Sequence, residues 1–258
     1  MNLKILSDAL LPSYIDGITY SPVEVLNELE KESTTVDQFQ FYAAVSSVYS
    51  SKIEGENIDF DSFFTHKFMK IPYQLDYTKK ADDLFLAYQF ILKNKLTFKN
   101  LQKAHAILSV NLLPKSQQGT IRTNPMFVIN SDDRIEYTEA GPSKLNSELE
   151  KLFTDIQFLQ AASIDDVESF YFAAYIHLVF VKIHPFQDGN GRSARLLEKW
   201  FLIEKLGLKA SAVQLEKKYY KNLADYYFNI KKISNDYELL DYSKCLDFLL
   251  MTVKGMKQ

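Results

Sequence analysis

One stretch decides how this chain is organised: Lys182-Ile-His-Pro-Phe-Gln-Asp-Gly-Asn-Gly-Arg-Ser-Ala-Arg-Leu196. It concentrates one histidine, one aspartate, two glycines and two arginines. The apolar, aromatic-rich residues 170–183 before it and residues 193–207 after it both have the length and spacing of helices. We therefore predict that the polar stretch is a loop between two helices. A loop held by buried helices is a common place for a functional site.

The amino-acid composition favours a mostly helical globular fold. Of the 258 residues, 47% are hydrophobic and 14% are aromatic, which is enough to bury a large core. Only 8 glycines and 7 prolines are present, fewer than the turns of many short strands would need. The sequence contains no repeat, low-complexity tract or linker, so we expect one domain over residues 1–258.

Charge and apolar patterning argue against two classes of partner. The formal net charge is −3, and no cluster of Lys and Arg interleaved with aromatics suggests nucleic-acid binding. No stretch approaches the roughly 20 apolar residues of a membrane span, so we expect a cytoplasmic protein with no membrane partner. Cys245 is the single cysteine, which excludes an intramolecular disulfide, and its apolar neighbours indicate a buried thiol.

Helical spacing predicts further helices on both sides of the polar stretch. Residues 1–35 have the pattern of an N-terminal arm that ends in a short helix beginning at Ser21-Pro22. Other helices are expected over residues 79–93 and 98–113, from residue 143, and twice within 215–253; Thr97 caps the second of these. Residues 60–77 give no clear element, because Pro72 interrupts any long helix.

The helix expected over residues 36–55 has an unusual end. We expect caps at Thr34 and Thr35 and a stop at Gly55. Glu54 then carries a carboxylate in the last turn, where the helix dipole disfavours negative charge by about 0.3–1 kcal/mol. Helix rules alone favour a solvated Glu54, but the unfavourable position leaves open that another group holds it there.

One segment has the pattern of strands. Residues 126–138 are rich in β-branched and aromatic side chains that alternate with polar ones around a turn at 131–134. We therefore predict a single β-hairpin in an otherwise helical protein.

The residue types in the central loop suggest a phosphate site. His184 precedes Pro185, which disfavours a right-handed helical backbone, and we expect its imidazole to titrate near neutral pH. Asp188 could hold a divalent cation of the Mg²⁺ kind through a carboxylate oxygen. Residues 189–191, Gly-Asn-Gly, can turn backbone N–H groups toward an anion, and they lead directly into a helix N-terminus.

Two arginines strengthen this interpretation. Arg192 and Arg195 are three residues apart, so both can point the same way from the start of the following helix. Each part of this stretch alone has an ordinary explanation, because Asp-Gly-Asn-Gly is a common turn sequence and arginine pairs usually lie in solvent. Two arginines at a helix N-terminus are nevertheless unfavourable, because the helix dipole already places positive charge there. Such a basic pair would be useful where an anion binds. The other histidines lack such neighbours, and we interpret them as structural: His66, His105 and His177.

These residues carry a family resemblance. The run from His184 to Arg195 resembles the signature of the Fic (filamentation induced by cyclic AMP) family, HPFxDGNGRxxR, and matches every defined position. Gly119, Arg122 and the predicted hairpin resemble the flap region of that family. Residues 50–55, Ser-Ser-Lys-Ile-Glu-Gly, match its inhibitory motif, [S/T]xxxE[G/N]. The similarity covers about residues 36–250.

The resemblance implies a helical Fic fold with one small β-hairpin and a catalytic core over about residues 85–250. Members of the family transfer AMP from ATP to a hydroxyl side chain of a target protein and release pyrophosphate. By this resemblance His184 is the general base, and Asp188 binds Mg²⁺ at the α- and β-phosphates. The phosphate oxygens are then bound by the backbone of Gly189 to Gly191, the Asn190 side chain, Arg192 and Arg195.

The resemblance also assigns the surroundings of this site. In the family the flap pairs with the target segment like a strand, which implicates Val128, Ile129, Ile135 and Tyr137. Tyr219-Tyr220 resembles a tyrosine pair beside the adenine, so Tyr220 is a nucleotide-binding candidate. The asparagine that some members place seven residues later is Tyr227 here, which leaves the nucleotide preference open.

The inhibitory motif gives Glu54 a different interpretation. In the family this glutamate pairs with the second arginine of the signature, here Arg195, and blocks the γ-phosphate from its productive position. Ser50, Glu54 and Gly55 would then form an inhibitory helix end within the same chain, over residues 36–55. Dimerisation is common in the family, so a homodimer is a further expectation, although no stretch identifies an interface.

Four activities remain in competition at this point. The first is a self-inhibited protein adenylyltransferase acting on an unidentified target protein. The second is a Doc-like kinase, which is disfavoured because that branch carries Lys where this chain has Gly191. The third is a de-AMPylase that removes AMP from a modified protein. The fourth is a non-catalytic regulatory or toxin-antitoxin-type binding module, against which the intact motif with His184 argues.

Overall fold

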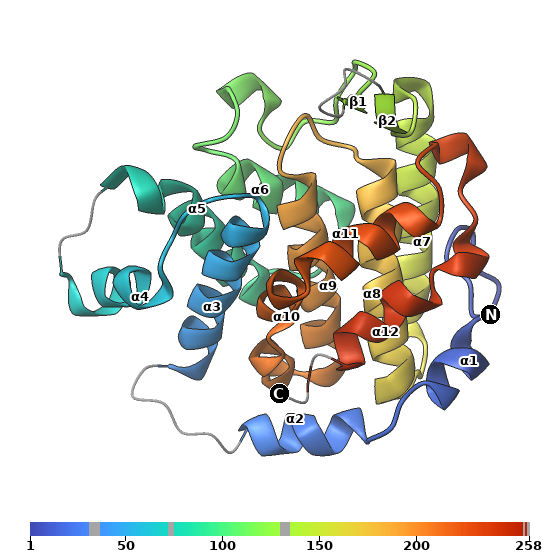
Figure 1. Ribbon diagram of the computed structural model, residues 1–258, viewed down its shortest axis with the longest axis horizontal. Coiled ribbons are helices and arrows are strands. Elements are labelled where there is room, and N and C mark those ends of the chain that lie inside the picture. Colours follow the sequence, from blue (N-terminus) through green and yellow to red (C-terminus); the bar gives the residue numbers. More distant parts are fainter. Residues whose placement is uncertain (31–36, 72–74, 130–134, 255, 257–258) are drawn as a thin grey trace.

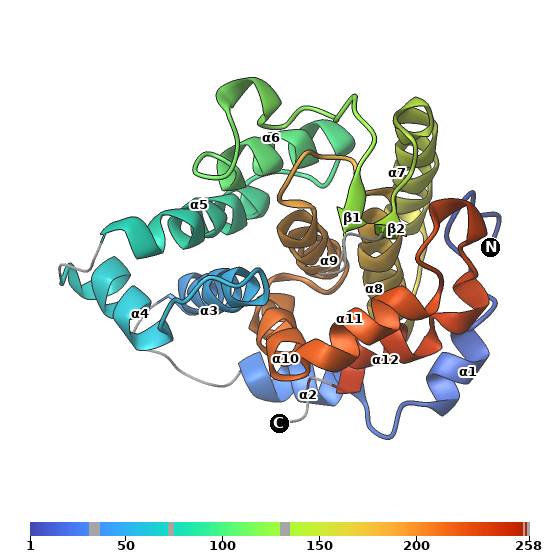
Figure 2. The same cartoon turned by 45° about the horizontal axis from the view of Figure 1, so that its top comes forward.

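The computed structural model describes residues 1–30, 37–71, 75–129, 135–254 and 256. Almost all of its regular structure is helical, as predicted, and two helices lie side by side at its centre (Figures 1 and 2). The helices are α1 Leu11–Asp16, α2 Pro22–Glu30, α3 Gln38–Ile53, α4 Phe60–Met69, α5 Leu75–Leu92, α6 Phe98–Leu108, α7 Leu145–Ala161, α8 Asp166–Ile183, α9 Asn190–Leu206, α10 Leu215–Lys221, α11 Leu223–Lys232 and α12 Leu246–Lys254. The two strands are β1 Phe127–Ile129 and β2 Ile135–Thr138.

The central pair, α8 and α9, flanks the polar loop. Nearly every side chain of α8 is buried, because the aromatic run leaves no polar face for solvent. A capping box starts α8: the Asp165 carboxylate accepts from the Glu168 N–H at 2.8 Å, and the Glu168 carboxylate accepts from the Asp165 N–H at 2.8 Å. The second helix begins at Asn190, three residues earlier than predicted, so the loop between the helices is only residues 184–189.

Helix α3 lies beside α5 and α10 and contacts α9 (Figure 1). Its first N–H groups are capped by Asp37, whose side chain accepts from the Gln40 N–H at 3.0 Å. The caps predicted at Thr34 and Thr35 lie outside the described residues. The helix ends at Ile53, and Gly55 follows with φ of 85°, a conformation that suits glycine. Most side chains of residues 38–53 are buried, so this helix is embedded in the protein.

The stretch that gave no clear pattern forms α4 and the start of α5. Helix α4 ends at Met69, and Lys70 follows in a left-handed conformation with φ of 57°. The predicted cap at Thr97 is present, since its hydroxyl accepts from the Asn100 N–H at 3.2 Å. Helix α6 ends at Leu108, five residues before the predicted end.

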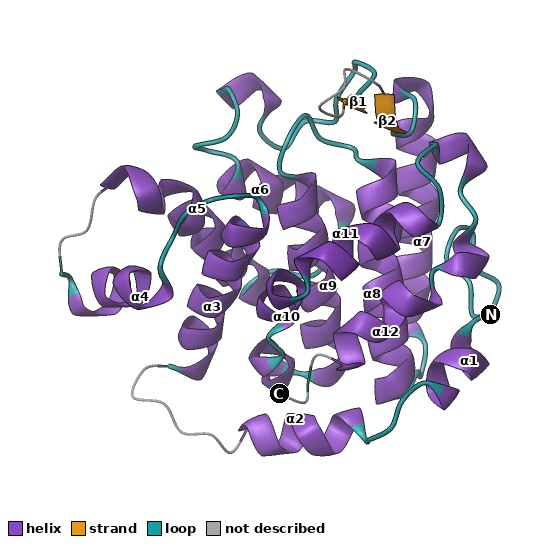
Figure 3. Cartoon of the chain, in the orientation of Figure 1, coloured by secondary structure: helices purple, strands orange, loops and turns teal. Residues whose placement is uncertain are grey.

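Strands β1 and β2 pair antiparallel at one end of the helical bundle (Figure 3). Val128 lies opposite Tyr137, and the register shifts between Val128 and Ile129. The predicted turn at 131–134 lies outside the described residues. After β2, the Thr138 N–H donates to the Asn235 carbonyl at 2.8 Å, which ties this end of the pair to the chain segment after α11.

Two further expectations can be compared with the structure. Cys245 is buried, as predicted, and burial raises the pKa of its thiol to about 12. Among the helices that the described residues form, none combines the length and the apolar character needed to cross a bilayer.

Candidate active site

His184 ends helix α8 in a strained backbone conformation. Its φ and ψ are 52° and 59°, in the left-handed region, where a residue other than glycine costs about 1–2 kcal/mol. Pro185, which follows His184, disfavours only the right-handed helical conformation of His184. His184 adopts the left-handed conformation, so the chain reverses direction here instead of extending. The His184 N–H still donates to the Phe180 carbonyl at 3.0 Å, and the His184 carbonyl accepts from Arg122 Nε at 2.7 Å. The surrounding contacts therefore hold the imidazole at one place.

The imidazole of His184 is neutral and has a defined tautomer. Its Nδ1 lies 3.2 Å from the Val181 carbonyl oxygen, which can only accept, so Nδ1 carries the proton. Burial, helped by the charge of Arg122, lowers the pKa of His184 to about 4, although the Val181 carbonyl, Glu54 and Asp188 oppose the shift. The expectation that this histidine titrates near neutral pH is therefore wrong. Its Nε2 has a free lone pair throughout the physiological range.

Asn190 closes the loop through its side chain. Its Oδ1 accepts from the Phe186 N–H at 2.9 Å, and its Nδ2 donates to the Phe186 carbonyl at 2.8 Å. This bridge starts α9 early and explains why the predicted start at residue 193 was too late. It also engages the side chain that the family resemblance assigned to phosphate oxygens. The backbone N–H groups of the first turn, which have no partner within a helix, are left for an anion.

His105 supports the same loop from α6. Its Nε2 donates to the Asp188 carbonyl at 2.9 Å, its Nδ1 accepts from the Gly119 N–H at 2.9 Å, and its ring stacks on Phe186 with centroids 3.7 Å apart. Burial lowers its pKa to about 4 despite the Asp188 carbonyl and charge, so it is neutral. From the sequence, His105 is interpreted as structural, because no chemically active residue lies near it along the chain. It contacts the site at Asp188, 83 residues along the chain, so no local pattern predicts this contact.

Arg195, the second arginine of the signature, lies in α9 and is buried against α3. Arg195 Nε donates to the Ser50 hydroxyl at 2.8 Å and Nη2 contacts the Ser50 carbonyl at 3.3 Å. Its Nη2 also forms an ion pair with Glu54 Oε1 at 2.5 Å. Burial alone would raise the pKa of Glu54, but Arg195 and Arg192 outweigh it and hold this pKa below its usual value. The structure thus brings Ser50, Glu54 and Arg195 together.

The Glu54 carboxylate also lies against the first turn of α9. A Cβ atom built on Gly191 would stand 2.5 Å from Glu54 Oε1 and 3.2 Å from Arg195 Nη1. Only a residue without a side chain leaves room for the carboxylate at this position. Glu54 therefore occupies the place where the helix dipole and Arg195 would both favour an anion.

Arg192 has a carboxylate partner that the sequence analysis missed. Its side chain is buried, and Nη2 lies 3.4 Å from Glu56 Oε1, which also accepts from Lys80 Nζ at 2.6 Å. Among the described residues, Nε of Arg192 is buried without a hydrogen-bond partner. The turn after α3 thus places one carboxylate beside each arginine of the first turns of α9. Glu54 pairs with Arg195, and Glu56 pairs with Arg192.

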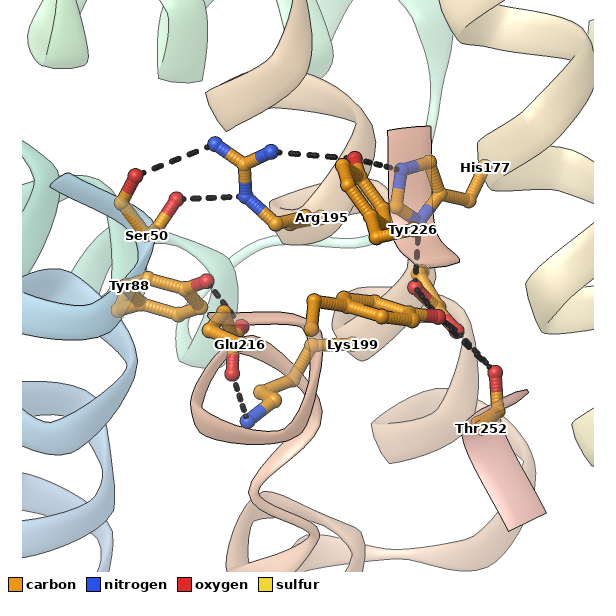
Figure 4. Close-up of polar contacts among 10 residues, drawn as sticks. Ser50, Tyr88, His177, Arg195, Lys199, Glu216, Tyr226 and Thr252 are labelled. Carbon is orange, nitrogen blue, oxygen red and sulfur yellow. Dashed lines mark hydrogen bonds and ion pairs between the residues drawn. The ribbon is translucent and has the colours of Figure 1, made fainter. Parts of the chain in front are cut away.

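A buried polar network extends from Arg195 into the C-terminal helices (Figure 4). Arg195 Nη1 donates to the Tyr226 hydroxyl at 3.2 Å, and Tyr226 contacts His177 Nε2 at 3.0 Å. His177 Nδ1 lies 2.6 Å from Glu198 Oε2, and Thr252 of α12 donates to Glu198 Oε1 at 2.9 Å. These contacts fix the guanidinium of Arg195 from the side opposite α3.

One turn further along α9, Lys199 makes a second buried link to α3 (Figure 4). Its Nζ donates to the Ser46 hydroxyl at 2.8 Å and pairs with Glu216 at 3.0 Å. Tyr88 of α5 donates to the other oxygen of Glu216 at 2.5 Å. Ser46 and Ser50 are four positions apart, as are Arg195 and Lys199, so two contacts one helical turn apart attach α3 to α9.

Asp188 is exposed at the edge of the loop, and its Oδ1 accepts from the Gly189 N–H at 2.6 Å. Within the described part of the chain, no group of three or more His, Cys, Asp or Glu side chains could form a complete protein cage for a metal ion. Mg²⁺ commonly binds through one or two carboxylates, several waters and the phosphates of a substrate. A single accessible aspartate beside an anion site fits that mode of binding.

The tyrosines that the family resemblance places near the nucleotide contact α3. Tyr220 packs against Tyr49 with ring centroids 5.7 Å apart, and Lys52 Nζ lies 5.4 Å from the Tyr220 ring. The Tyr227 hydroxyl donates to the Ile53 carbonyl at 3.1 Å, at the end of α3. For the flap candidates Val128, Ile129, Ile135 and Tyr137 the structure describes backbone pairing alone, and their side chains lie outside the described part.

Comparison with known proteins matches the part of the chain that contains the loop. A sequence model of the Fic/DOC family matches residues 95–202. The curated relatives include a protein adenylyltransferase Fic of Drosophila persimilis, 28% identical over 124 residues, and protein adenylyltransferase fic-1 of Caenorhabditis elegans, 33% identical over 81 residues. The two matches cover 47% and 31% of this chain, but only 22% and 14% of those relatives' own length.

Three solved structures share the fold over nearly the whole chain. A Fic family protein from Desulfovibrio desulfuricans has a TM-score of 0.76 at 15% identity, covering 99% of this chain and 74% of its own. A Fic domain containing signaling protein from Bacteroides thetaiotaomicron has a TM-score of 0.66 at 17% identity, covering 95% and 92%. Fic-1 from C. elegans has a TM-score of 0.64 at 17% identity, covering 96% and 68%. Identities this low show the fold alone. Together these comparisons show that the chain has the fold of Fic proteins and that its residues 95–202 match the Fic/DOC family.

Proposed function

We propose that this chain is a self-inhibited protein adenylyltransferase that transfers AMP from ATP to a hydroxyl side chain of a target protein. The observation that carries the proposal is the placement of a neutral histidine next to an anion site. His184 presents Nε2 at the end of α8, and the first turn of α9 offers backbone N–H groups together with Arg192 and Arg195. The likeness to proteins named adenylyltransferases supports the same reaction class.

The chemistry needs a base, a phosphate site and a line of attack. The target hydroxyl oxygen would form a bond to the α-phosphorus of ATP, and the bond from that phosphorus to the bridging oxygen would break. Pyrophosphate would leave, and His184 Nε2 would take the hydroxyl proton. A base that is already neutral at pH 7 needs no prior deprotonation, which suits this step.

The remaining loop groups would bind and orient the nucleotide. Backbone N–H groups of residues 190–192 and the two arginines would hold phosphate oxygens in an enclosed site, where such contacts are strong. Asp188 would hold Mg²⁺, which when bound supplies positive charge to the phosphates. The β1–β2 pair would hold the target segment by strand-like backbone pairing. We also propose that residues 1–258 act as one domain around this site.

The position of Glu54 supports the self-inhibition in this proposal. Its carboxylate takes up both the Arg195 guanidinium and the space over Gly191, so a phosphate cannot use either at the same time. Arg195 and Arg192 outweigh the effect of burial and hold the pKa of Glu54 below its usual value, so the carboxylate is charged at pH 7 and can substitute for an anion. Activation then requires the carboxylate, and not the whole of α3, to move.

A labelling experiment tests the proposal. The full chain is incubated with Mg²⁺, ATP labelled at the α-phosphate and a cell extract, and transfer of label to protein is measured. Glu54→Ala is expected to raise labelling and His184→Ala to abolish it in the Glu54→Ala background. Glu150→Ala, an exposed acidic position on α7, is the matched control and should leave labelling at the wild-type level. No labelling by Glu54→Ala with any extract would refute the transferase assignment.

The reverse reaction is a second candidate, and one observation favours it. Glu54 lies close enough to His184 for its charge to affect the pKa of the imidazole, so the two could position and deprotonate a water together. In that case the wild-type chain would remove AMP from a modified protein, and Glu54→Ala would not. Measuring AMP release from a target labelled by the Glu54→Ala variant separates the two activities.

A further inference from the structure

Arg122 connects three separate segments of the chain. It lies in the loop between α6 and β1 and is 5% exposed. Its Nε donates to the His184 carbonyl at 2.7 Å, Nη1 to the Asn124 carbonyl at 2.8 Å and Nη2 to the Ala140 carbonyl at 2.6 Å. Its own backbone N–H donates to the Pro185 carbonyl at 2.9 Å. One planar guanidinium therefore links both ends of the β1–β2 segment to the residue that carries the base.

The position of these carbonyls is informative. Asn124 stands just before β1, Ala140 just after β2, and His184 adopts a left-handed conformation that does not follow from its own sequence preference. A guanidinium offers several N–H donors in a rigid planar arrangement, so fixing one carbonyl fixes the directions to the others. A lysine in the same place would be a single point charge and could not hold all three.

We propose that Arg122 is a positioning residue for the transfer reaction, because it sets the imidazole of His184 relative to the strand pair that receives the target hydroxyl. This inference rests on the proposed function, in which His184 is the base and β1–β2 holds the target. Reactions of this kind are sensitive to geometry, since a displacement of about 1 Å between reacting groups can lower a rate by 10²-fold.

The charge of Arg122 gives a second, separable effect. The groups that act on the His184 imidazole are Arg122, which disfavours its protonation, and the Val181 carbonyl, Glu54 and Asp188, which favour it. Around Arg122 itself lie Glu139, a carboxyl whose pKa is raised by burial and lowered by Arg122 and Lys182, and Lys182, whose pKa burial lowers to about 7. Removing the Arg122 charge should therefore raise the pKa of His184, and replacing it with lysine should not.

Two substitutions separate geometry from charge. In the Glu54→Ala background, initial rates of labelling are measured against ATP concentration and pH with Mg²⁺ present. Arg122→Lys is expected to lower kcat by roughly 10- to 100-fold, with KM for ATP within about twofold of the parent and the acid limb of the pH profile unmoved. Arg122→Gln is expected to lower kcat similarly and to move the acid limb to higher pH. Lys103→Gln, an exposed charge on α6, is the control and should match the parent.

Each outcome decides the inference. If Arg122→Lys keeps the parent kcat, or if KM for ATP rises in step with the loss of rate, the positioning role is overturned. An Arg122→Lys chain that is unfolded at the assay temperature by circular dichroism assigns the residue to stability and overturns it as well. If the Glu54→Ala parent itself labels nothing, the proposed function has failed separately. Nitrogen NMR, which reports the tautomer and the pKa of the His184 imidazole, then tests the inference. If the tautomer and the pKa are unchanged in both Arg122 variants, the inference is refuted.

Discussion

Replacing Gly191 by alanine tests whether the Glu54 carboxylate lies over the first turn of α9. The added Cβ would stand 2.5 Å from Glu54 Oε1, whereas ordinary van der Waals contact begins at 3.4 Å. The carboxylate would have to move by about 1 Å, because it is the free end of a flexible side chain and the helix backbone is not. That movement breaks or weakens the 2.5 Å contact with Arg195 Nη2.

The expected magnitude follows from two opposing terms. A hydrogen bond to a charged partner contributes about 1.5–3 kcal/mol to stability, which the wild-type chain would partly lose. Alanine is better than glycine in a helix by up to about 1 kcal/mol, and less in the first turn. Gly191→Ala should therefore destabilise the wild-type chain by about 1–2 kcal/mol. In a Glu54→Ala background the 2.5 Å clash is gone, and only Arg195 Nη1, the end of a flexible side chain 3.2 Å from the added Cβ, has to shift slightly. The same substitution should therefore cost almost nothing or stabilise by up to about 1 kcal/mol.

Urea unfolding of four proteins measures this difference: wild type, each single variant and the double variant. The coupling free energy between positions 54 and 191 should be about 2 kcal/mol, with the double variant more stable than the two single effects predict. Effects that add to within about 0.5 kcal/mol would refute the placement of the carboxylate against Gly191. Gly141→Ala offers a matched control, because a Cβ there meets no atom within 4 Å.

Three further predictions follow from contacts around the loop. Glu56→Gln removes the carboxylate partner of Arg192 and should tighten ATP binding, measured by calorimetry, by about 2- to 5-fold, since Glu56 is partly exposed and such pairs contribute less than about 1 kcal/mol. Tyr227→Phe removes the hydroxyl that donates to the Ile53 carbonyl at the end of α3. The substitution should lower the free energy of unfolding by about 0.5–1.5 kcal/mol and raise labelling. If neither quantity changes, this hydrogen bond does not hold the end of α3 in place. The pKa of His105 is about 4 when folded and about 6.5 when unfolded, so the unfolded chain binds more protons and stability falls as pH decreases from 6.5 toward 4, by up to about 3 kcal/mol. His105→Asn should flatten that part of the urea-derived stability profile, and an equal slope in both proteins would show that His105 does not contribute to it.

Much of the loop could be predicted because its chemistry is local. His184, Asp188, Gly191 and the two arginines fall within twelve consecutive positions, so their types and spacing already indicated an anion site with an adjacent base. The helices on either side were predictable for a similar reason, since an unbroken aromatic run such as that of α8 has few alternatives to burial.

What the sequence could not supply were the contacts between distant segments. Nothing near Glu56 suggests that it meets Arg192, 136 residues later, or that Lys80 shares the same oxygen. The pKa of His184 was misjudged because it depends on how closely other elements enclose the imidazole, and that is a property of packing. The early start of α9 depends on one side chain, Asn190, turning back onto Phe186, which spacing rules do not see.

The two contacts between α3 and α9 have a consequence for how this protein can change over evolutionary time. Ser50 and Ser46 contact the helix that follows the loop, so in the proposed function the helix that ends at the inhibitory Glu54 also supports the candidate site. Under that proposal, a truncation or a large substitution in α3 would remove the activity together with its inhibition. If Glu54 inhibits this chain as proposed, inhibition would be lost mainly through single side-chain changes at positions 54 and 56 of the turn after α3, and any descendant that keeps the fold would keep the helix on which this inhibition depends.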